Sequence, residues 1–424
     1  MTDDDVQGAR PPVSRRGLIS GIAGGFAAGA VAGAGGAAAF AAAAAPASAP
    51  EDESETVDLT RSHPFYGQAH QAGIQTEQQR YTVYMTFDLT SPLASDLQVL
   101  LARWSGAIAQ MMQGLPIGSV EPDGSGAVAL DTGEAYELSP ASLTVTVGLG
   151  PGVFDDRFGL AAKRPKHLAD LPDLPSDQLQ DETSGGDLSL QACADDPQVA
   201  YHAIRDLTRM ARGVATTRWT VLGFGRASAG KGQKTPRNLM GFKDGTRNIK
   251  EESDFDRFVW VGDDQAWTRG GSYQVVRKIQ MNIETWDADP VGDQQDVFGR
   301  TKAVGAPLTG EREFDVPDFA KRSGDATVIP QTSHVALAAH ENNGGVKILR
   351  RGYNYTDGLN RVGLLDAGLL FLSYQNDPQH FITLQTRLGS VDRLNEYIQH
   401  IGSAIFFTPR SPKRGRYIGQ ELFE

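Results

Sequence analysis

The sequence predicts an α+β fold made of two ferredoxin-like halves, with antiparallel sheets and peripheral helices. Strand-like and helix-like segments follow one another in β-α-β order twice, over two stretches of similar length. The strand-like segments alternate between apolar and polar residues, which is typical of antiparallel strands with one covered face. We therefore expect an N-terminal half at residues 63–225 and a C-terminal half at residues 226–424.

The first half contains four strand-like and two helix-like segments. Strands are predicted at residues 81–89, 143–147, 188–193 and 219–224. A helix is predicted over residues 97–112, because apolar residues recur there every three or four positions. A second helix follows Asp195-Asp196-Pro197 and runs to about residue 212, with its aspartates at the end that a helix dipole favours. Residues 163–187 are rich in Pro and Asp and predict a loop.

The second half repeats this order loosely. It predicts a long strand over residues 272–286 and shorter strands at residues 334–337, 346–349, 369–374 and 405–407. Helices are predicted over residues 293–300 and 391–401.

The first 49 residues resemble an export signal, and residues 50–62 are acidic and polar, as a linker would be. Arg15-Arg16, within Ser-Arg-Arg-Gly-Leu-Ile, matches a twin-arginine pattern, and an almost pure Gly/Ala run follows it at residues 21–45. Ala47-Ser48-Ala49 fits a cleavage site, although Pro50 favours an earlier cut within the alanines. A low-complexity tail is the alternative, but the paired arginines favour export to the periplasm or the exterior.

Composition excludes several classes of protein. A formal net charge of -12 argues against nucleic-acid binding, which usually needs a basic face. No strongly apolar run is long enough to predict a stable membrane span. The single cysteine, Cys193, cannot form an intramolecular disulfide and is predicted to be a small buried side chain.

Residues 241–248, Gly-Phe-Lys-Asp-Gly-Thr-Arg-Asn, are the most informative stretch and are called the octet. Its two glycines predict a tight, partly left-handed turn, in which Asp244 would only cap nearby amides. The longer pattern Gly-Phe-Lys-Asp-Gly-Thr-x-Asn resembles the signature of the dye-decolorising peroxidases, whose Asp lies above a haem. The resemblance is to the branch of deferrochelatases and peroxidases that is exported by the twin-arginine route.

The resemblance continues along the chain from Phe65 onward. Residues 63–74, the Ser-His-Val-Ala-Leu-Ala segment at 333–338, the Ile-Leu-Arg-Arg strand at 348–351 and the Asp-Ala-Gly-Leu segment from 366 to 377 all look like family segments. The resemblance implies the same duplicated fold and one haem b per chain. The haem would be bound non-covalently, since the sequence has no Cys-x-x-Cys-His motif.

The resemblance also implies a role for four side chains. His334 would bind the haem iron on one face, and Asp244 and Arg350 would lie on the other. Asp244 would move the peroxide proton, and Arg350 would assist cleavage of the O–O bond. Its neighbour Arg351 would point to solvent, because successive strand residues face opposite sides. Asp392 would accept a hydrogen bond from the axial imidazole, with Glu396 as the competing acceptor.

The haem rim would be formed by the end of the octet and by one further histidine. Gly245, Thr246, Arg247 and Asn248 are expected there, and a cation at Arg247 would suit a propionate. The family commonly reads Asn-Pro-Arg where this chain has Ala-His-Glu, so His340 is expected at an altered haem edge.

The leading hypothesis is an exported haem b peroxidase that reduces hydrogen peroxide and oxidises a bulky or aromatic organic donor. Because carboxyl groups ionise at lower pH than imidazoles, an Asp as proton mover implies an acidic optimum. The alternative is a protein that releases iron from haem in an iron-uptake system. A duplicated binding module without cofactor is a third reading. The sequence leaves open the reductant, any iron-uptake partner, and whether the protein is a homodimer or higher oligomer.

Overall fold

A computed structural model describes residues 57–225, 235–262 and 264–424. The predicted signal segment, its cleavage site and most of the predicted linker lie outside this part of the chain. Contacts group Glu55–Glu424 into one compact unit, which contains both predicted halves. The predicted boundary between the halves, at residues 225 and 226, adjoins residues outside the described ranges and stays a prediction.

The described residues form one nine-stranded sheet in which every strand pairing is antiparallel. The strands are β1 (Tyr81–Leu89), β2 (Thr144–Leu149), β3 (Leu188–Ala194), β4 (Ala215–Phe224), β5 (Ser272–Met281), β8 (Leu349–Arg350), β9 (Tyr353–Leu359), β10 (Leu365–Gln375) and β11 (Ile398–Thr408). Their order is β5-β11-β2-β3-β1-β4-β9-β10-β8. Because β5 also pairs with β10, the sheet closes on itself as a barrel. A separate hairpin joins β6 (Arg322–Ser323) to β7 (Ala326–Thr327).

The two halves of the barrel have the same topology. The first half has the order β2-β3-β1-β4, which is the second, third, first and fourth strand along the chain. The second half has the order β9-β10-β5-β11. If the two-residue strands β6, β7 and β8 are left out, these are again the second, third, first and fourth strand along the chain. The halves join where β2 pairs with β11 and where β4 pairs with β9. The predicted duplicated ferredoxin-like fold is therefore confirmed.

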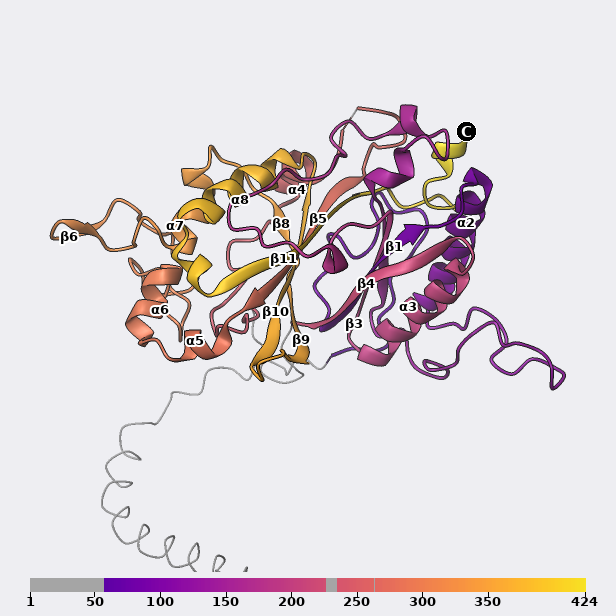
Figure 1. Ribbon diagram of the computed structural model, residues 1–424, viewed down its shortest axis with the longest axis horizontal. Coiled ribbons are helices and arrows are strands. Elements are labelled where there is room, and N and C mark those ends of the chain that lie inside the picture. The colour runs from indigo at the N-terminus through magenta and orange to yellow at the C-terminus, as the bar shows by residue number, and fades with distance from the viewer. Residues whose placement is uncertain (1–56, 226–234, 263) are drawn as a thin grey trace, which may run out of the picture. The chain divides into compact units, whose positions relative to one another are not determined.

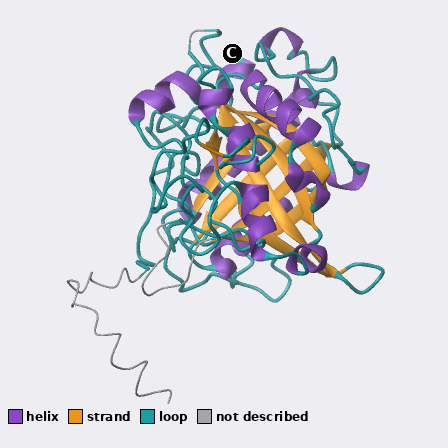
Figure 2. Cartoon of the chain, turned by 90° about the vertical axis from the view of Figure 1, so that its left-hand side faces the viewer, coloured by secondary structure: helices purple, strands orange, loops and turns teal. Residues whose placement is uncertain are grey.

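Helices cover the outside of the barrel (Figures 1 and 2). They are α2 (Ala94–Met111), α3 (Pro197–Ala211), α4 (Glu252–Phe258), α5 (Ile283–Asp287), α6 (Val291–Phe298), α7 (His334–Ala338) and α8 (Gln379–Val391). The pair α2 and α3 packs on the first half, at the right of Figure 1, and α5 to α8 gather on the second half. Asp196 caps α3 by accepting hydrogen bonds from the backbone of Gln198 and Val199, as its position predicts.

The barrel interior is filled by side chains. One buried cluster consists only of strand residues, and they come from seven strands of the barrel. It includes Cys193, which is buried as predicted. Next to this cluster, Gln274 accepts from the Tyr84 hydroxyl and donates to the Tyr374 hydroxyl. The hydroxyls of Tyr353 and Tyr355, within the cluster, have no hydrogen-bond partner among the described residues.

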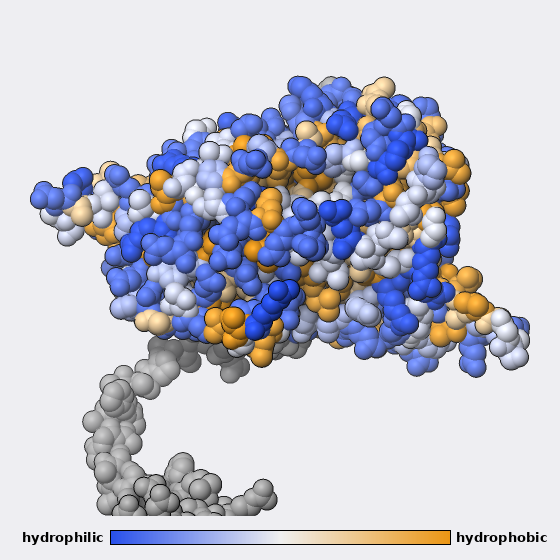
Figure 3. Space-filling view, viewed as in Figure 1, coloured by the Kyte–Doolittle hydropathy of each residue, from blue (hydrophilic) through white to orange (hydrophobic). Residues whose placement is uncertain are grey.

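The outer face is mostly hydrophilic, with apolar side chains in scattered patches (Figure 3). Among the described residues, no helix combines the length and the apolar character needed to cross a membrane.

Three element predictions in the second half are wrong. The strand that begins at Ser272 ends at Met281, and Ile283–Asp287 is helical. Residues 334–337 are helical rather than extended, because Ser333 caps the segment and accepts from the backbone of Ala336. Short apolar runs fit either structure, and a cap decides between them. Residues 391–401 contain the end of α8, a 3₁₀ turn and the start of β11 instead of one helix.

Two further differences concern residues 346–349 and α8. Of the predicted strand at residues 346–349, only Leu349 is in a strand, as the first residue of β8. The strand is short because only the two residues of β8 pair with β10 here. The helix α8 was not predicted. Its start has a sequence signal, since Asp377 accepts from the backbone of Gln379 next to Pro378.

Candidate active site

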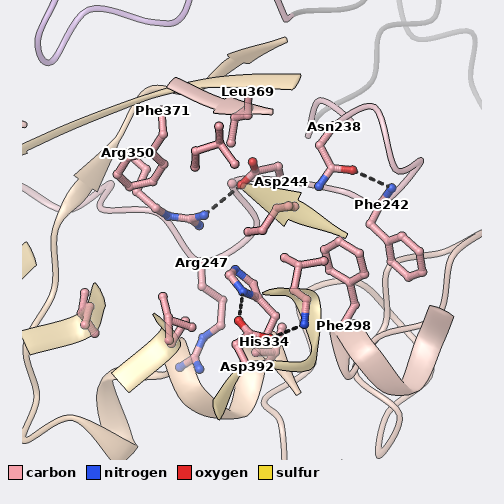
Figure 4. Close-up of a pocket in the computed structure, with 18 of the residues that line it drawn as sticks. Asn238, Phe242, Asp244, Arg247, Phe298, His334, Arg350, Leu369, Phe371 and Asp392 are labelled. Carbon is pink, nitrogen blue, oxygen red and sulfur yellow. Dashed lines mark hydrogen bonds and ion pairs between the residues drawn. The ribbon is translucent and has the colours of Figure 1, made fainter. Parts of the chain in front are cut away.

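A pocket with mainly apolar walls lies in the second half, between the outer surface of β5 and β10 and the helices α7 and α8 (Figure 4). Leu369 and Phe371 line it, whereas Leu370 and Leu372 belong to the interior of the barrel. This alternation follows from the two-residue period of a strand. The other apolar walls are Met240, Phe242, Ile279, Met281, Phe298, Val335, Val346, Ile348, Phe381, Leu384, Leu388, Leu394 and Ile398.

The octet forms one wall, and its backbone conformation depends on glycine. Gly245 has a φ of 110°, in the region that only glycine adopts without strain. A Cβ on Gly241 would come within 2.9 Å of the Lys302 side chain. Phe242 anchors the turn by stacking on Phe298 at a centroid distance of 4.1 Å. This anchored turn presents Asp244 to the pocket (Figure 4).

Asp244 and Arg350 form an ion pair on this wall. Arg350 Nη1 donates to Asp244 Oδ1 over 2.8 Å, and both side chains are about one-third exposed, at 30% and 29%. Asn248 fixes the backbone of Arg350, because its Oδ1 accepts from Arg350 N over 2.8 Å and its Nδ2 donates to Arg350 O over 2.7 Å. The octet thus positions both charged groups of the pair, although they are far apart in the sequence.

His334 lies across the pocket, at the start of α7. Its Nδ1 is 2.7 Å from Asp392 Oδ2, and the carboxylate is nearly buried, with 3% of its side chain exposed. Since a carboxylate only accepts, Nδ1 carries the proton and Nε2 of the neutral imidazole keeps its lone pair. Nε2 makes no hydrogen bond to any residue that the structure describes. It is therefore available to a metal.

Asp392 also shifts the pKa of the His334 imidazole. Burial alone would lower the pKa of His334, but the adjacent Asp392 carboxylate raises it above the usual value for histidine. Asp392 is itself held by the Leu394 N–H, which donates to its Oδ1 over 2.9 Å. A metal at Nε2 would therefore meet a more basic ligand than an imidazole without this carboxylate. Asp392 rather than Glu396 is the acceptor.

The rim of the pocket is cationic. Arg247 makes a bidentate pair with Glu341, with N···O distances of 3.1 and 2.5 Å, and its Nη2 is 3.5 Å from His340 Nδ1. Arg247 and His340 both line the pocket, as do Gly245 and Thr246.

Arg300 is a second rim cation that the sequence did not single out. Its guanidinium is nearly buried and donates to the carbonyls of Gly305 and Glu313 over 2.6 and 2.9 Å. Burial, and then the charge of Arg247, lower the pKa of Arg300 to about 10. Burial and a neighbouring cation both disfavour the charged form of this guanidinium, so a nearby anion would stabilise it.

Glu313 is another functional residue that the sequence did not reveal. It accepts from Lys243 and Thr246 within the octet and from Thr235 before it, and so fastens the octet to a distant loop. Burial alone would raise the pKa of Glu313, but the hydrogen bond from Lys243 and those from the two threonines lower it. Only the lysine in the octet hints that an acidic partner exists.

Two predicted side chains lie elsewhere. Asn248 does not line this pocket and instead holds the backbone of Arg350, because its amide faces β8. Arg351 does not point to solvent. It is 4% exposed and donates to the carbonyls of Thr76 and Glu77 and to the Gln79 side chain. The strand does turn the two arginines to opposite sides, but the second side is covered by residues 76–79 rather than by water.

The donor set of the pocket fits a haem. An imidazole with one nitrogen fixed by a carboxylate and the other free is a suitable axial ligand. Apolar walls suit a porphyrin, and the rim cations Arg247 and Arg300 suit its two carboxylates. The Asp244–Arg350 pair stands on the wall across from the imidazole, where a second iron ligand would bind (Figure 4).

Known proteins are similar to this chain in sequence and in structure. The chain matches the family model for the N-terminal part of Dyp-type peroxidases over residues 71–225, and that for the C-terminal part over residues 235–413. It is 40% identical over 376 residues to deferrochelatase from Escherichia coli strain K12, which covers 85% of this chain and 86% of that protein.

Two solved structures are also similar. Ferric DtpA from Streptomyces lividans has a TM-score of 0.80 and 39% identity, over 86% of this chain and 97% of that one. A DyP-type peroxidase from Streptomyces coelicolor has a TM-score of 0.81 and 38% identity, over 88% of this chain and 100% of that one.

Proposed function

Because this chain belongs to the Dyp-type peroxidase family and is a haem peroxidase, we propose that its pocket reduces hydrogen peroxide between His334 and the Asp244–Arg350 pair. The observation that carries the proposal is that one apolar pocket contains both a carboxylate-bound imidazole and, on another wall, a paired acid and guanidinium. An axial ligand and a distal acid–base group with a cation are what haem-dependent peroxide cleavage requires.

Each polar residue has a separate task in this proposal. His334 would hold the haem, which would supply redox chemistry at its iron for the reduction of peroxide. Asp244 removes the proton from the nearer peroxide oxygen and delivers it to the departing one, so that water leaves. Arg350 stabilises the negative charge that develops on the departing oxygen. Asp392 accepts from Nδ1 of His334, so that the lone pair of the neutral imidazole is on Nε2, and it makes that nitrogen a stronger donor.

The electron donor is proposed to be a bulky or aromatic organic molecule that is oxidised outside the pocket or at its rim. The pocket itself would be filled by the haem, so a large donor would have to react from its edge. Arg247 and His340, which are partly exposed, stand at that edge. We propose that they replace the contacts that other family members make through Asn-Pro-Arg.

The test of the proton-transfer step is Asp244→Asn. The substitution keeps the size of the side chain and its capacity to accept from Arg350, but removes the base. We expect the rate of haem oxidation by peroxide to fall by about 10²–10⁴-fold wherever proton transfer limits. The pH dependence of the rate should also change, because the variant has no base at this position. Stopped-flow absorbance over a pH series measures both, and an unchanged rate and profile would reduce the octet to a turn that holds the pocket.

Iron release from haem is a second candidate, and the similarity to deferrochelatase favours it. The same pocket would hold the haem in either case. The two candidates differ in product, since iron release leaves an intact tetrapyrrole and free iron without consuming peroxide. Incubating the protein with haem and no peroxide, and then quantifying free iron by a chelator, separates them.

We also propose that the protein is exported by the twin-arginine route. The arginine pair, the Gly/Ala run and the small residues before Pro50 support this proposal. Replacing both Arg15 and Arg16 by lysine should retain the full-length precursor in the cytoplasm, whereas the parent chain should be cut between about Ala41 and Pro50. Fractionation with N-terminal sequencing checks this, and mature protein outside the cytoplasm despite the replacement would refute the route.

A further inference from the structure

A second cluster of polar residues lies in the first half, on elements that contribute nothing to the haem pocket. His202 and Asp206 are one turn apart on α3, and Asp131 reaches them from the long loop between α2 and β2, which lies beside α3 (Figure 1). All three are nearly buried, with exposed fractions of 5%, 1% and 1%. Their ligand atoms lie within 4.8 Å of one another, and no other group of this kind occurs in the described ranges.

The distances within the cluster suit a shared cation better than hydrogen bonds. His202 Nε2 is 3.6 Å from Asp131 Oδ2 and 3.5 Å from Asp206 Oδ2. Both separations exceed the usual N–H···O range of about 2.7–3.2 Å. Donors at about 2.0–2.2 Å from a tetrahedral zinc ion stand roughly 3.4 Å apart. The two carboxylate oxygens therefore lie about as far from Nε2 as two ligand atoms of one zinc ion lie from each other.

A buried oxygen without a hydrogen bond provides independent support. Asp206 Oδ1 is shielded from solvent and accepts no hydrogen bond; its ion pair with Arg209 Nη1 is long, at 3.7 Å, while Oδ2 accepts from the Thr132 N–H over 3.4 Å. Buried carboxylates are costly unless they are paired or coordinate a metal. Asp131 already accepts from two backbone N–H groups, of Ile117 and Gly133, so it is oriented but not neutralised.

The other imidazole nitrogen has the partner that a metal-bound histidine usually has. His202 Nδ1 is 3.2 Å from Glu134 Oε2, and Arg205 holds Glu134 from the other side over 2.6 Å. With its Nδ1–H donated to a carboxylate, the imidazole turns an Nε2 lone pair toward Asp131 and Asp206. This is the carboxylate–histidine–metal arrangement, built from residues on the loop and on α3.

We propose that His202 Nε2, Asp131 and Asp206 bind one Zn²⁺ ion, with Glu134 as the acceptor for His202 Nδ1. One imidazole and two carboxylates are ligands that zinc accepts, and water would complete the tetrahedron. The ion fastens the loop to α3. That loop spans residues 112–143 without helix or strand, a length that usually needs an anchor. This site is separate from the peroxidase pocket and does not depend on the function proposed for it.

The experiment uses the haem-loaded protein after treatment with EDTA and removal of the chelator. Zinc is added, unbound metal is removed by gel filtration, and bound zinc is counted per chain by elemental analysis. We expect one zinc per chain, a higher thermal midpoint with zinc, and slower proteolysis of the loop. Asp206→Asn should lose the zinc and the zinc-dependent gain in midpoint. Glu134→Gln, which removes only the acceptor for Nδ1, should weaken zinc binding by roughly 10–100-fold.

The matched control is His63→Gln, which changes a half-buried histidine of the same half whose Nε2 meets only the Ser142 hydroxyl. It should bind zinc as the parent does. Asp131→Asn serves as a second ligand variant if Asp206→Asn fails to fold, and the haem absorption band reports folding in each case. Absence of stoichiometric zinc in the parent protein would overturn the proposal, as would equal zinc binding by a folded ligand variant. In either event the cluster is a set of side-chain contacts that needs no metal.

Discussion

His334→Ala is expected to lose most of its bound haem. His334 Nε2 makes no hydrogen bond among the described residues, and Nδ1 is held by the nearly buried carboxylate of Asp392. The other two histidines of the pocket are held differently. Nδ1 of His340 faces Glu341, which is 37% exposed and already paired with Arg247, and Nε2 of His400 meets Gln385. The ratio of haem absorbance to protein absorbance after purification measures the loss.

Two further observations make this test specific. Added imidazole should restore haem binding to His334→Ala, because a free ligand can occupy the space that the side chain leaves beside Asp392. His340→Ala is the comparison variant, since it removes a second imidazole from the same pocket and should keep the axial bond and its spectrum. If His340→Ala loses the haem and His334→Ala keeps it, His340 is the ligand.

Arg350→Leu is expected to slow oxidation of the haem by peroxide by about 10²–10³-fold, at every pH. The loss of one preorganised donor that stabilises developing charge typically costs about 2.7–4 kcal/mol, which corresponds to that factor. The substitution also releases Asp244 from its 2.8 Å ion pair, so the base loses its orientation as well. Haem content should stay near that of the parent, because Arg350 lies on the wall across from His334 (Figure 4). Stopped-flow absorbance gives the rate.

Arg350→Lys separates charge from geometry. A lysine keeps the positive charge but cannot reproduce the guanidinium fork, so we expect a rate between those of the parent and Arg350→Leu. A parent-like rate in Arg350→Leu would exclude Arg350 as the distal cation. Arg351 would not take its place, because its guanidinium is committed to Thr76, Glu77 and Gln79 on the other side of the strand.

The fold class was predicted from local patterns, and the residues of the site were proposed through family resemblance. Strand alternation identified the antiparallel sheets, and the glycines of the octet identified the turn that carries Asp244. His334 and Asp392 were proposed through family resemblance, and the structure brings them within 2.7 Å of each other.

The parts that the sequence missed depend on contacts between distant segments. Glu313 and Arg300 lie in an irregular stretch with no periodicity. The partners of Glu313 in the octet, Lys243 and Thr246, are 70 and 67 residues away, and Arg300 bonds to Gly305 and to Glu313 itself. Arg351 is buried because residues 76–79 cover it. The sequence of β8 alone cannot predict this contact with a distant segment. The helix at His334 was taken for a strand because a five-residue apolar run has no distinctive period.

The absorption spectrum of the purified protein, recorded before and after addition of one equivalent of hydrogen peroxide, tests the central claim most directly. We predict a Soret band in the parent protein that changes within milliseconds of mixing. The change should be at least tenfold slower in both Asp244→Asn and Arg350→Leu. A protein that binds haem in this pocket but shows the same rapid change in all three forms would contradict the account, since the Asp244–Arg350 pair would then have no part in peroxide cleavage.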